Sequence, residues 1–357
     1  MSDRRKEAEE KMAKAIFISA DCWLCVFDLL PPRQLGLGIS MISRRFDFYV
    51  DEHFKTRKWA LKSMELLPKD EADGTWGMKI VKFYDGDELP IPKIQMPRKV
   101  IGFECIIISY IDRNAIAFLR RFRQLFAACQ INLTINTKSD RILKFILRNV
   151  WPMFGQNIHG LEMSTRNFHH LRQFVPSILN ECTSLRLIDA YYYDFFAKFP
   201  CDNSATASDG QAVAKWLFTP RPDNVPKVLF CSLHTDDRNL SSNIEPFNAA
   251  FASASSPANF IIVIWFHYSA DFVVPFELIN ELTREQLTLK ATDYSNRFLF
   301  VRSPIERDES KWAKWEKEAI GWECFDQCNQ IYIRINENKI GDGLLDATPG
   351  PSDQQQK

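Results

Sequence analysis

The chain has 357 residues, enough for two domains or for one long repeat structure with a sizeable core. Its 45 Lys and Arg residues balance 45 Asp and Glu residues, so the formal net charge is zero. This balance argues against a general electrostatic grip on nucleic acid or on an anionic membrane, and we expect neither as a partner.

The sequence predicts neither export nor membrane insertion. Its first residues are charged and contain no continuous apolar stretch, unlike a secretory signal. The longest apolar run, FIIVIWF at 260–266, is too short to span a bilayer and predicts a buried strand. The nine cysteines are scattered and odd in number, so we expect reduced thiols and a cytoplasmic or nuclear protein.

The N-terminal part predicts a charged segment, 1–17, followed by a compact helical domain, 18–61. The first helix of this domain contains DCWLCVFDLL at 21–30, which is apolar almost all round, and we expect Asp21 to cap it. Two more short helices follow before residue 61. Three such helices cannot bury that much apolar surface among themselves, so they either dock on the rest of the chain or offer a face to another protein.

Two cysteines in the first helix have the C-x-x-C spacing of redox and zinc sites. A zinc site needs four ligands, and the nearest second pair, Cys324 and Cys328, lies far along the chain at a wider spacing. A thioredoxin-like motif would lie between a strand and a helix rather than inside a helix. We therefore interpret Cys22 and Cys25 as small apolar residues and expect no metal and no cofactor.

The remainder predicts a linker, 62–98, and an α/β domain, 99–340, with a disordered tail at 341–357. In the α/β domain, short β-branched runs alternate with amphipathic helical stretches. Strands are expected near residues 104, 131, 158 and 185, a spacing of roughly 27 residues that falls in the leucine-rich-repeat range. We predict a degenerate leucine-rich-repeat-like α/β solenoid of parallel strands joined by helices, with an open α/β sandwich as the alternative.

No motif for a catalytic nucleophile, a phosphate loop or a zinc protease occurs, so we do not expect an enzyme. An enzyme would need polar side chains that converge at one end of the parallel strands. His169 and His170 are adjacent in a helical run and are interpreted as helix surface. The arginines of FLRRFRQLF at 118–126 are interpreted as a solvated face, and Trp312, Trp315 and Trp322 as core first and a partner surface second.

The helical domain resembles an F-box. In the usual F-box pattern an apolar helix is followed by an Asp-Leu pair and then by Val-Ser-Arg-x-Trp. Here Phe27 and Leu30 occupy the places of the aromatic residue and the leucine near the end of that apolar helix. Gln34 and Leu35 stand for the Asp-Leu pair, and ISRRF at 42–46 stands for Val-Ser-Arg-x-Trp. Phe46 replaces the tryptophan, and the wider chain is similar to the expanded nematode F-box-like proteins.

The resemblance implies a substrate-recognition subunit of a Skp-cullin-F-box ubiquitin ligase. F-box proteins dock on a Skp-family adaptor of the cullin ligase and select a protein target with the rest of the chain. The alternative is a protein-interaction scaffold, outside any ligase, whose helices dock internally. The residues expected to contact the adaptor are Trp23, Leu24, Phe27, Leu30, Pro31, Leu35, Ile42 and Phe46. The alternative for each of these residues is that it belongs to the hydrophobic core of the helical domain itself.

Overall fold

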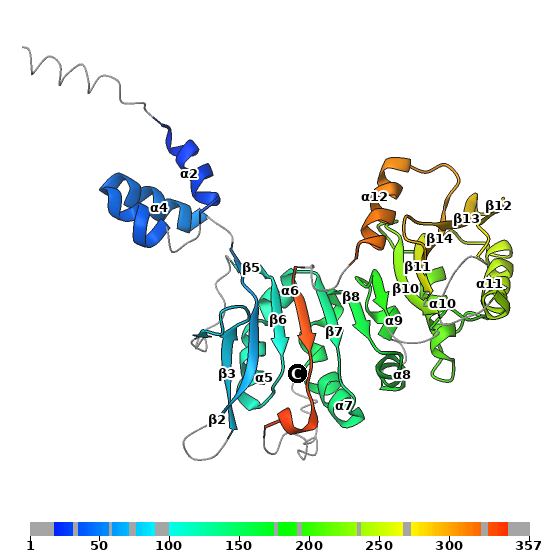
Figure 1. Ribbon diagram of the computed structural model, residues 1–357, viewed down its shortest axis with the longest axis horizontal. Helices are drawn as coiled ribbons and strands as arrows, with labels where there is room; N and C mark the ends of the chain where they lie inside the picture. Colours follow the sequence, from blue (N-terminus) through cyan, green and yellow to red (C-terminus); the bar gives the residue numbers. More distant parts are fainter. Residues whose placement is uncertain are drawn as a thin grey trace, which may run out of the picture. The chain divides into compact units, whose positions relative to one another are not determined.

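The computed structural model of the protein describes residues 18–30, 35–56, 59–70, 76–89, 100–174, 178–190, 195–233, 237–266, 273–322 and 328–341 (Figure 1). The chain divides into two units, Met1–Trp59 and Ala60–Lys357. The charged segment 1–17, Pro31 and the predicted tail beyond residue 341 lie outside the described residues. No described helix is both long and apolar enough to cross a membrane.

The first unit is helical, as expected. It contains α2 (Ala20–Asp28), the π-turn η1 (Leu35–Ile39), the 3-10 turn η2 (Ser40–Ile42) and α4 (Arg44–Thr56). Ser19 rather than Asp21 caps α2, because its hydroxyl accepts a hydrogen bond from the backbone N–H of Cys22. The middle helix is not α-helical, consistent with the poor helix propensity of the glycines in LGLGI.

The second unit is built on a mixed sheet that has 13 strands among the described residues. Its strand order is β12-β13-β14-β11-β10-β9-β8-β7-β15-β6-β2-β3-β4. The strands are β2 (Met64–Asp70), β3 (Trp76–Lys82), β4 (Glu88–Leu89), β6 (Cys105–Ile108), β7 (Ile131–Ile135), β8 (Ile158–Met163), β9 (Leu187–Asp189), β10 (Lys227–Leu233), β11 (Phe260–Phe266), β12 (Phe276–Asn280), β13 (Glu285–Ala291), β14 (Arg297–Pro304) and β15 (Gln330–Ile333). The strands from β2 to β11 in this order are parallel, and antiparallel strands extend the sheet at both ends. Two short strands, β1 (Trp59–Leu61) and β5 (Val100–Phe103), pair separately.

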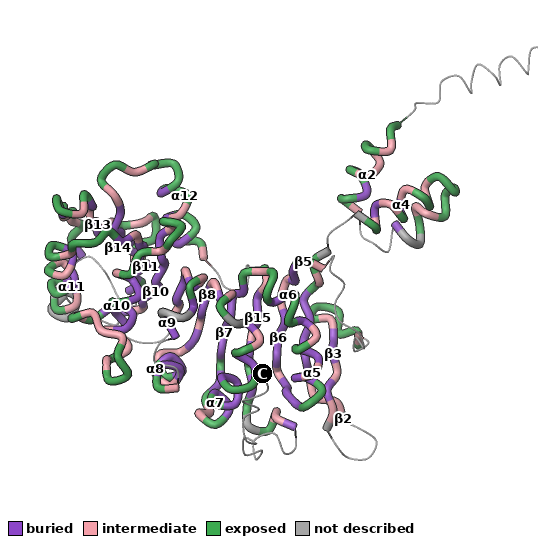
Figure 2. Tube along the Cα trace, turned by 180° about the vertical axis from the view of Figure 1, so that it is seen from behind, coloured by how far each residue is buried: buried purple, intermediate pink, exposed green. Residues whose placement is uncertain are grey.

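Helices cover the two faces of this sheet unequally (Figures 1 and 2). One face packs on α5 (Arg113–Arg121), α6 (Arg123–Ala128), α7 (Asp140–Asn149), α8 (Thr165–Phe174), α9 (Ile178–Glu181), α10 (Asp209–Phe218) and α11 (Asp237–Ala252). Only α12 (Glu309–Ile320) contributes a described helix to the core of the opposite face, where it packs on β9, β10, β11 and β14. Three 3-10 turns complete the unit: η3 (Trp151–Met153), η4 (Gly155–Asn157) and η6 (Glu337–Lys339).

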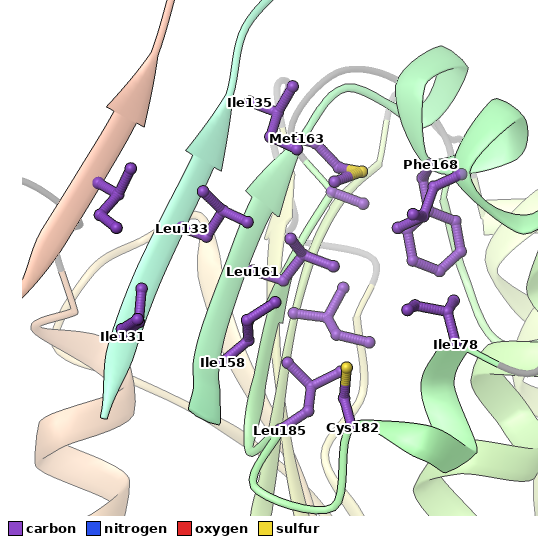
Figure 3. Close-up of a cluster of buried hydrophobic side chains, with 14 of the residues drawn as sticks. Ile131, Leu133, Ile135, Ile158, Leu161, Met163, Phe168, Ile178, Cys182 and Leu185 are labelled. Atoms are coloured by element: carbon purple, nitrogen blue, oxygen red, sulfur yellow. The ribbon is translucent and has the colours of Figure 1, made fainter. Parts of the chain in front are cut away.

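The sequence of each central strand reflects this unequal cover. In β11, Ile262 and Ile264 belong to the core under the larger helical layer, and Ile261 and Val263 to the core under α12. In β7, Ile131, Leu133 and Ile135 face the helices, as Figure 3 shows, while the polar residues between them face the other side. In β11 the apolar residues on both faces therefore reflect helical cover on both sides of the sheet.

The predicted mixture of parallel strands and helices is confirmed, but the leucine-rich-repeat-like solenoid is not. Strands β7 to β11 lie side by side in chain order, as repeats would. However, β15 lies between β6 and β7 and is parallel to both. The spacing of consecutive segments cannot predict this insertion, because β15 comes from the C-terminal part of the sequence.

Residues 62–98 are more than the predicted linker. Strands β2, β3 and β4 come from this stretch, and β2 pairs in parallel with β6. Leu66, Met78 and Ile80 are buried in the main core. The Pro, Gly and Asp residues that suggested a linker are common in the turns between short strands.

Candidate functional site

The first helix of the N-terminal unit has a buried side and an exposed side. Phe27 is fully buried, and Trp23, Leu24 and Leu30 pack partly buried around it. On the other side, Cys22, Cys25, Val26 and Leu29 are exposed at helical spacing. Val26 is 43% exposed and Leu29 is 84% exposed, although both are aliphatic. The helix thus carries an apolar stripe that its own unit does not cover.

Further apolar side chains of this unit are exposed beyond α2. Met41 and Ile42 are 78% and 63% exposed in η2, and Phe48 of α4 is 59% exposed. We refer to Val26, Leu29, Met41, Ile42 and Phe48 as the exposed apolar set. So many exposed large apolar side chains in one small unit are typical of a surface that binds another protein.

The predicted contact residues divide between the core and this surface. Phe27 and Leu35 have no exposed area and form the unit's core with Val50, so in this fold they hold the unit together. The rings of Trp23 and Phe46 meet edge to face at 4.7 Å and are partly buried, as are Leu24 and Leu30. Only Ile42 is exposed, and Pro31 lies outside the described residues.

The sequence interpretation missed several exposed side chains of this unit. Leu29, Val26 and Met41 were not among the expected contacts, although they are exposed. Cys22 and Cys25 are exposed free cysteines on the same side of the helix. The spacing of Trp23, Leu24, Phe27 and Leu30 at i, i+1, i+4 and i+7 could have identified the inward side.

The sheet face that α12 leaves uncovered carries a row of polar side chains. Thr134, Glu162 and Asp189 are register partners on β7, β8 and β9. Thr134 donates a hydrogen bond to Glu162 at 3.0 Å, and Gln330 of β15 donates one to Thr134 at 2.8 Å. Burial raises the pKa of Asp189 to about 7, and the neighbouring Glu162 charge raises it further in the same direction.

A cavity of about 500 Å³ lies at the amino ends of β7, β8, β9 and β10, against the C-terminal end of α12. It is lined by Gln130, Asn132, His159, Arg186, Leu187, Val228, Glu318, Ala319, Gly321, Trp322, Cys328 and Asn329. Polar side chains therefore converge at one end of the parallel strands. Among the described residues, no cluster of His, Cys, Asp or Glu side chains could hold a metal ion.

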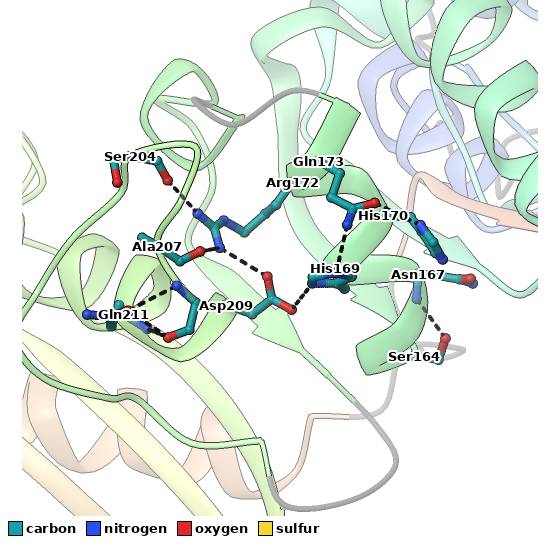
Figure 4. A network of polar contacts seen from close by, with 11 residues as sticks. Ser164, Asn167, His169, His170, Arg172, Gln173, Ser204, Ala207, Asp209 and Gln211 are labelled. Atoms are coloured by element: carbon teal, nitrogen blue, oxygen red, sulfur yellow. Dashed lines mark hydrogen bonds and ion pairs between the residues drawn. The ribbon is translucent and has the colours of Figure 1, made fainter.

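The histidine pair belongs to a polar network that joins α8 to the start of α10 (Figure 4). His169 Nδ1 lies 3.0 Å from Asp209 Oδ2, and Arg172 Nη1 donates to Asp209 Oδ1 at 3.0 Å. Arg172 is 4% exposed and also donates to the carbonyls of Ala207 and Ser204. His169 and His170 lie at the helix surface, as predicted, and the buried arginine anchors the segment before α10.

We expect Asp209→Ala to lower the free energy of unfolding by about 2 kcal/mol, because a buried guanidinium loses its carboxylate partner. Denaturant titration of the full chain would measure the change. His169→Ala is the control and should change stability by less than about 0.5 kcal/mol, because that side chain is 55% exposed. Equal effects of the two substitutions would contradict the assigned anchoring role of Arg172.

The arginine-containing run at 118–126 and the tryptophans of 312–322 lie where the sequence predicted them. Phe118, Leu119, Phe122 and Phe126 are buried, while Arg120 and Arg123 are exposed. Trp312 is 4% exposed in the core under α12, and Trp315 and Trp322 pack partly buried against it.

Comparison of the chain with protein families, with curated proteins and with solved structures finds no match in any of the three.

Proposed function

We propose that the protein is a substrate-recognition subunit of a Skp-cullin-F-box ubiquitin ligase. In this proposal residues 18–61 are an F-box-like domain that docks on a Skp-family adaptor, and the α/β unit binds a protein target. The observation that supports docking is the exposed apolar set, because it lies on a unit whose own core is already closed around Phe27, Leu35 and Val50. Apolar side chains at helical spacing are suited to a hydrophobic groove on a partner.

The exposed apolar set gives a sharper test than those predicted contact residues that are buried in the core. Substitution of Phe27 would open a cavity in the small core and cost about 3–5 kcal/mol, so lost binding would report unfolding. Leu29 and Ile42 are 84% and 63% exposed, so a polar residue at either place leaves the core unchanged.

We expect the full chain to bind a purified Skp-family adaptor, and Leu29→Asp and Ile42→Asp each to weaken binding at least tenfold. Burying a carboxylate at an apolar interface costs more than about 1.4 kcal/mol, which is tenfold in affinity. Calorimetric titration would measure the affinity, and circular dichroism would confirm retained helix content.

Leu282→Asp is the matched control, because Leu282 is 74% exposed in the α/β unit. It should leave the affinity for the adaptor unchanged. If the intact chain does not bind the adaptor, or binds it equally well with both substitutions, the ligase function is excluded and the interaction scaffold with internally docked helices becomes the better explanation.

A further inference from the structure

The cavity beside α12 contains a β-bulge that redirects a histidine. Ile131 of β7 pairs with Ile158, but the next residue, Asn132, pairs with Gly160. His159 is therefore the extra residue of a bulge in β8, and bulges commonly redirect a side chain next to a binding site. Gly160 contributes no side chain, and a Cβ there would lie 2.6 Å from Asn132 Oδ1. The bulge and the glycine together leave room for Asn132 and His159 in the cavity wall.

Two buried side-chain atoms in this wall have no hydrogen-bond partner among the described residues. Asn132 is 7% exposed and donates from Nδ2 to the carbonyl of Cys328, while its Oδ1 is unpaired. The Nδ1 atom of His159 is likewise buried and has no hydrogen-bond partner in the part of the chain that the structure describes. A neutral imidazole ring carries a single proton, and we assign it to Nε2. In this tautomer Nδ1 is an acceptor, like Asn132 Oδ1, and a ligand that donates hydrogen bonds to both atoms would satisfy them.

The charges around the cavity restrict which donor can satisfy these acceptors. Arg186 donates from Nε to the carbonyl of Pro226, and its Nη2 lies 3.7 Å from the Glu318 carboxylate. Burial lowers the pKa of His159 to about 4, and the positive charges of Arg186 and Arg221 contribute in the same direction. Arg186 lines the same cavity, so an ammonium or guanidinium group beside His159 would meet a like charge. A carboxylate carries no N–H donor for the two acceptors.

We propose that this cavity binds a neutral primary carboxamide group. Its NH2 would donate to Asn132 Oδ1 and His159 Nδ1, and its carbonyl oxygen would accept from Arg186. The apolar part of the ligand would lie against Leu187, Val228 and Trp322, which also line the cavity. The volume of about 500 Å³ is in the range of small-molecule sites, and it also accommodates a glutamine side chain of a protein segment. The proposal does not depend on adaptor docking.

Ligand-observed NMR on the full chain tests this proposal with two matched pairs of probes. Nicotinamide against nicotinate represents a free small molecule, and N-acetylglutamine methylamide against N-acetylglutamate methylamide represents a protein side chain. We expect at least one carboxamide to bind at least tenfold more tightly than its carboxylate, because a site built for N–H donors rejects an analogue without them. The pair that shows this difference identifies the source of the carboxamide. Equal binding within both pairs, or no binding by either carboxamide, would overturn the proposal.

Two substitutions localise the binding. Asn132→Leu and His159→Phe remove one acceptor each at similar volume, and each should weaken carboxamide binding at least tenfold. Asn136→Leu is the matched control beyond the opposite end of the same strand, because Asn136 is exposed and does not line the cavity; it should have no effect. Thermal melting confirms that each variant is folded, and unchanged binding in a folded Asn132→Leu or His159→Phe variant would overturn the assignment.

Discussion

Glu285→Ala is expected to lower the free energy of unfolding of the α/β unit by about 3–5 kcal/mol. Glu285 and Arg302 form an ion pair whose side chains are 1% and 0% exposed. Arg302 Nε donates to Glu285 Oε2 at 3.1 Å, and the other carboxylate oxygen accepts from the backbone N–H of Ala258 at 2.8 Å. The substitution leaves the guanidinium buried between the rings of Phe218 and Phe251 without its counter-charge.

Urea titration followed by circular dichroism would measure this loss. Glu306→Ala is the control, because Glu306 pairs with Arg284 across the same hairpin but is 85% exposed, and its loss should cost less than about 1 kcal/mol. The double variant Glu285→Leu/Arg302→Met should be more stable than Glu285→Ala, since it leaves no unpaired charge. If the double variant is less stable than Glu285→Ala, the unpaired charge of Arg302 is not the cause of the lost stability.

Asp189→Asn is expected to raise the free energy of unfolding by about 2–4 kcal/mol at pH 8 and to change it little at pH 4.5. The folded protein holds the pKa of Asp189 at about 7, above its ordinary value of 3.8. Between pH 3.8 and about pH 7, the folded state therefore binds a proton at Asp189 that the unfolded state has lost. The contribution of this carboxyl group to stability is therefore full below pH 4 and is lost as pH rises to 7. An amide avoids this loss because it never ionises.

Urea midpoints of both proteins at the two pH values would measure the effect. Asp223→Asn is the control with the opposite sign, because the hydrogen bond from Arg221 lowers the pKa of Asp223. It should destabilise the protein at pH 8 and have a smaller effect in acid. If Asp189→Asn is equally destabilising at both pH values, ionisation of Asp189 does not limit the stability of the folded protein and the prediction is wrong.

Local pattern was sufficient for most elements of the α/β unit. The β-branched runs and their spacing predicted strands near 104, 131, 158 and 185, and β6, β7, β8 and β9 begin at Cys105, Ile131, Ile158 and Leu187. The helical periodicity of 118–126 separated the buried phenylalanines from the exposed arginines. These properties depend on residues close together in the chain, and a strand or helix imposes its own period on them.

The site in the α/β unit could not be predicted in this way. Asn132 and His159 lie in separate strand segments, and Trp322 comes from the end of a helix much later in the chain. Only the parallel pairing of β7 with β8, and the place of α12 over the sheet, bring them to one cavity. The bulge at His159 is a property of two paired strands, so neither strand sequence predicts it alone.

The sequence by itself determined that residues 21–30 form a helix too apolar to be stable alone, because the number of apolar side chains on a short helix sets how much cover it needs. Which of those side chains are covered was decided only by the tertiary structure. Phe27 packs with Leu35 and Val50 from two later elements, and that choice of partners turns Val26 and Leu29 outward. In the same way, the alternation of β-branched runs with helical stretches indicated an α/β fold, whereas the insertion of β15 between β6 and β7 depended on pairing across the whole unit. The physical reason is the same in both cases: periodicity is local, but burial and strand pairing are settled between segments that the sequence keeps far apart.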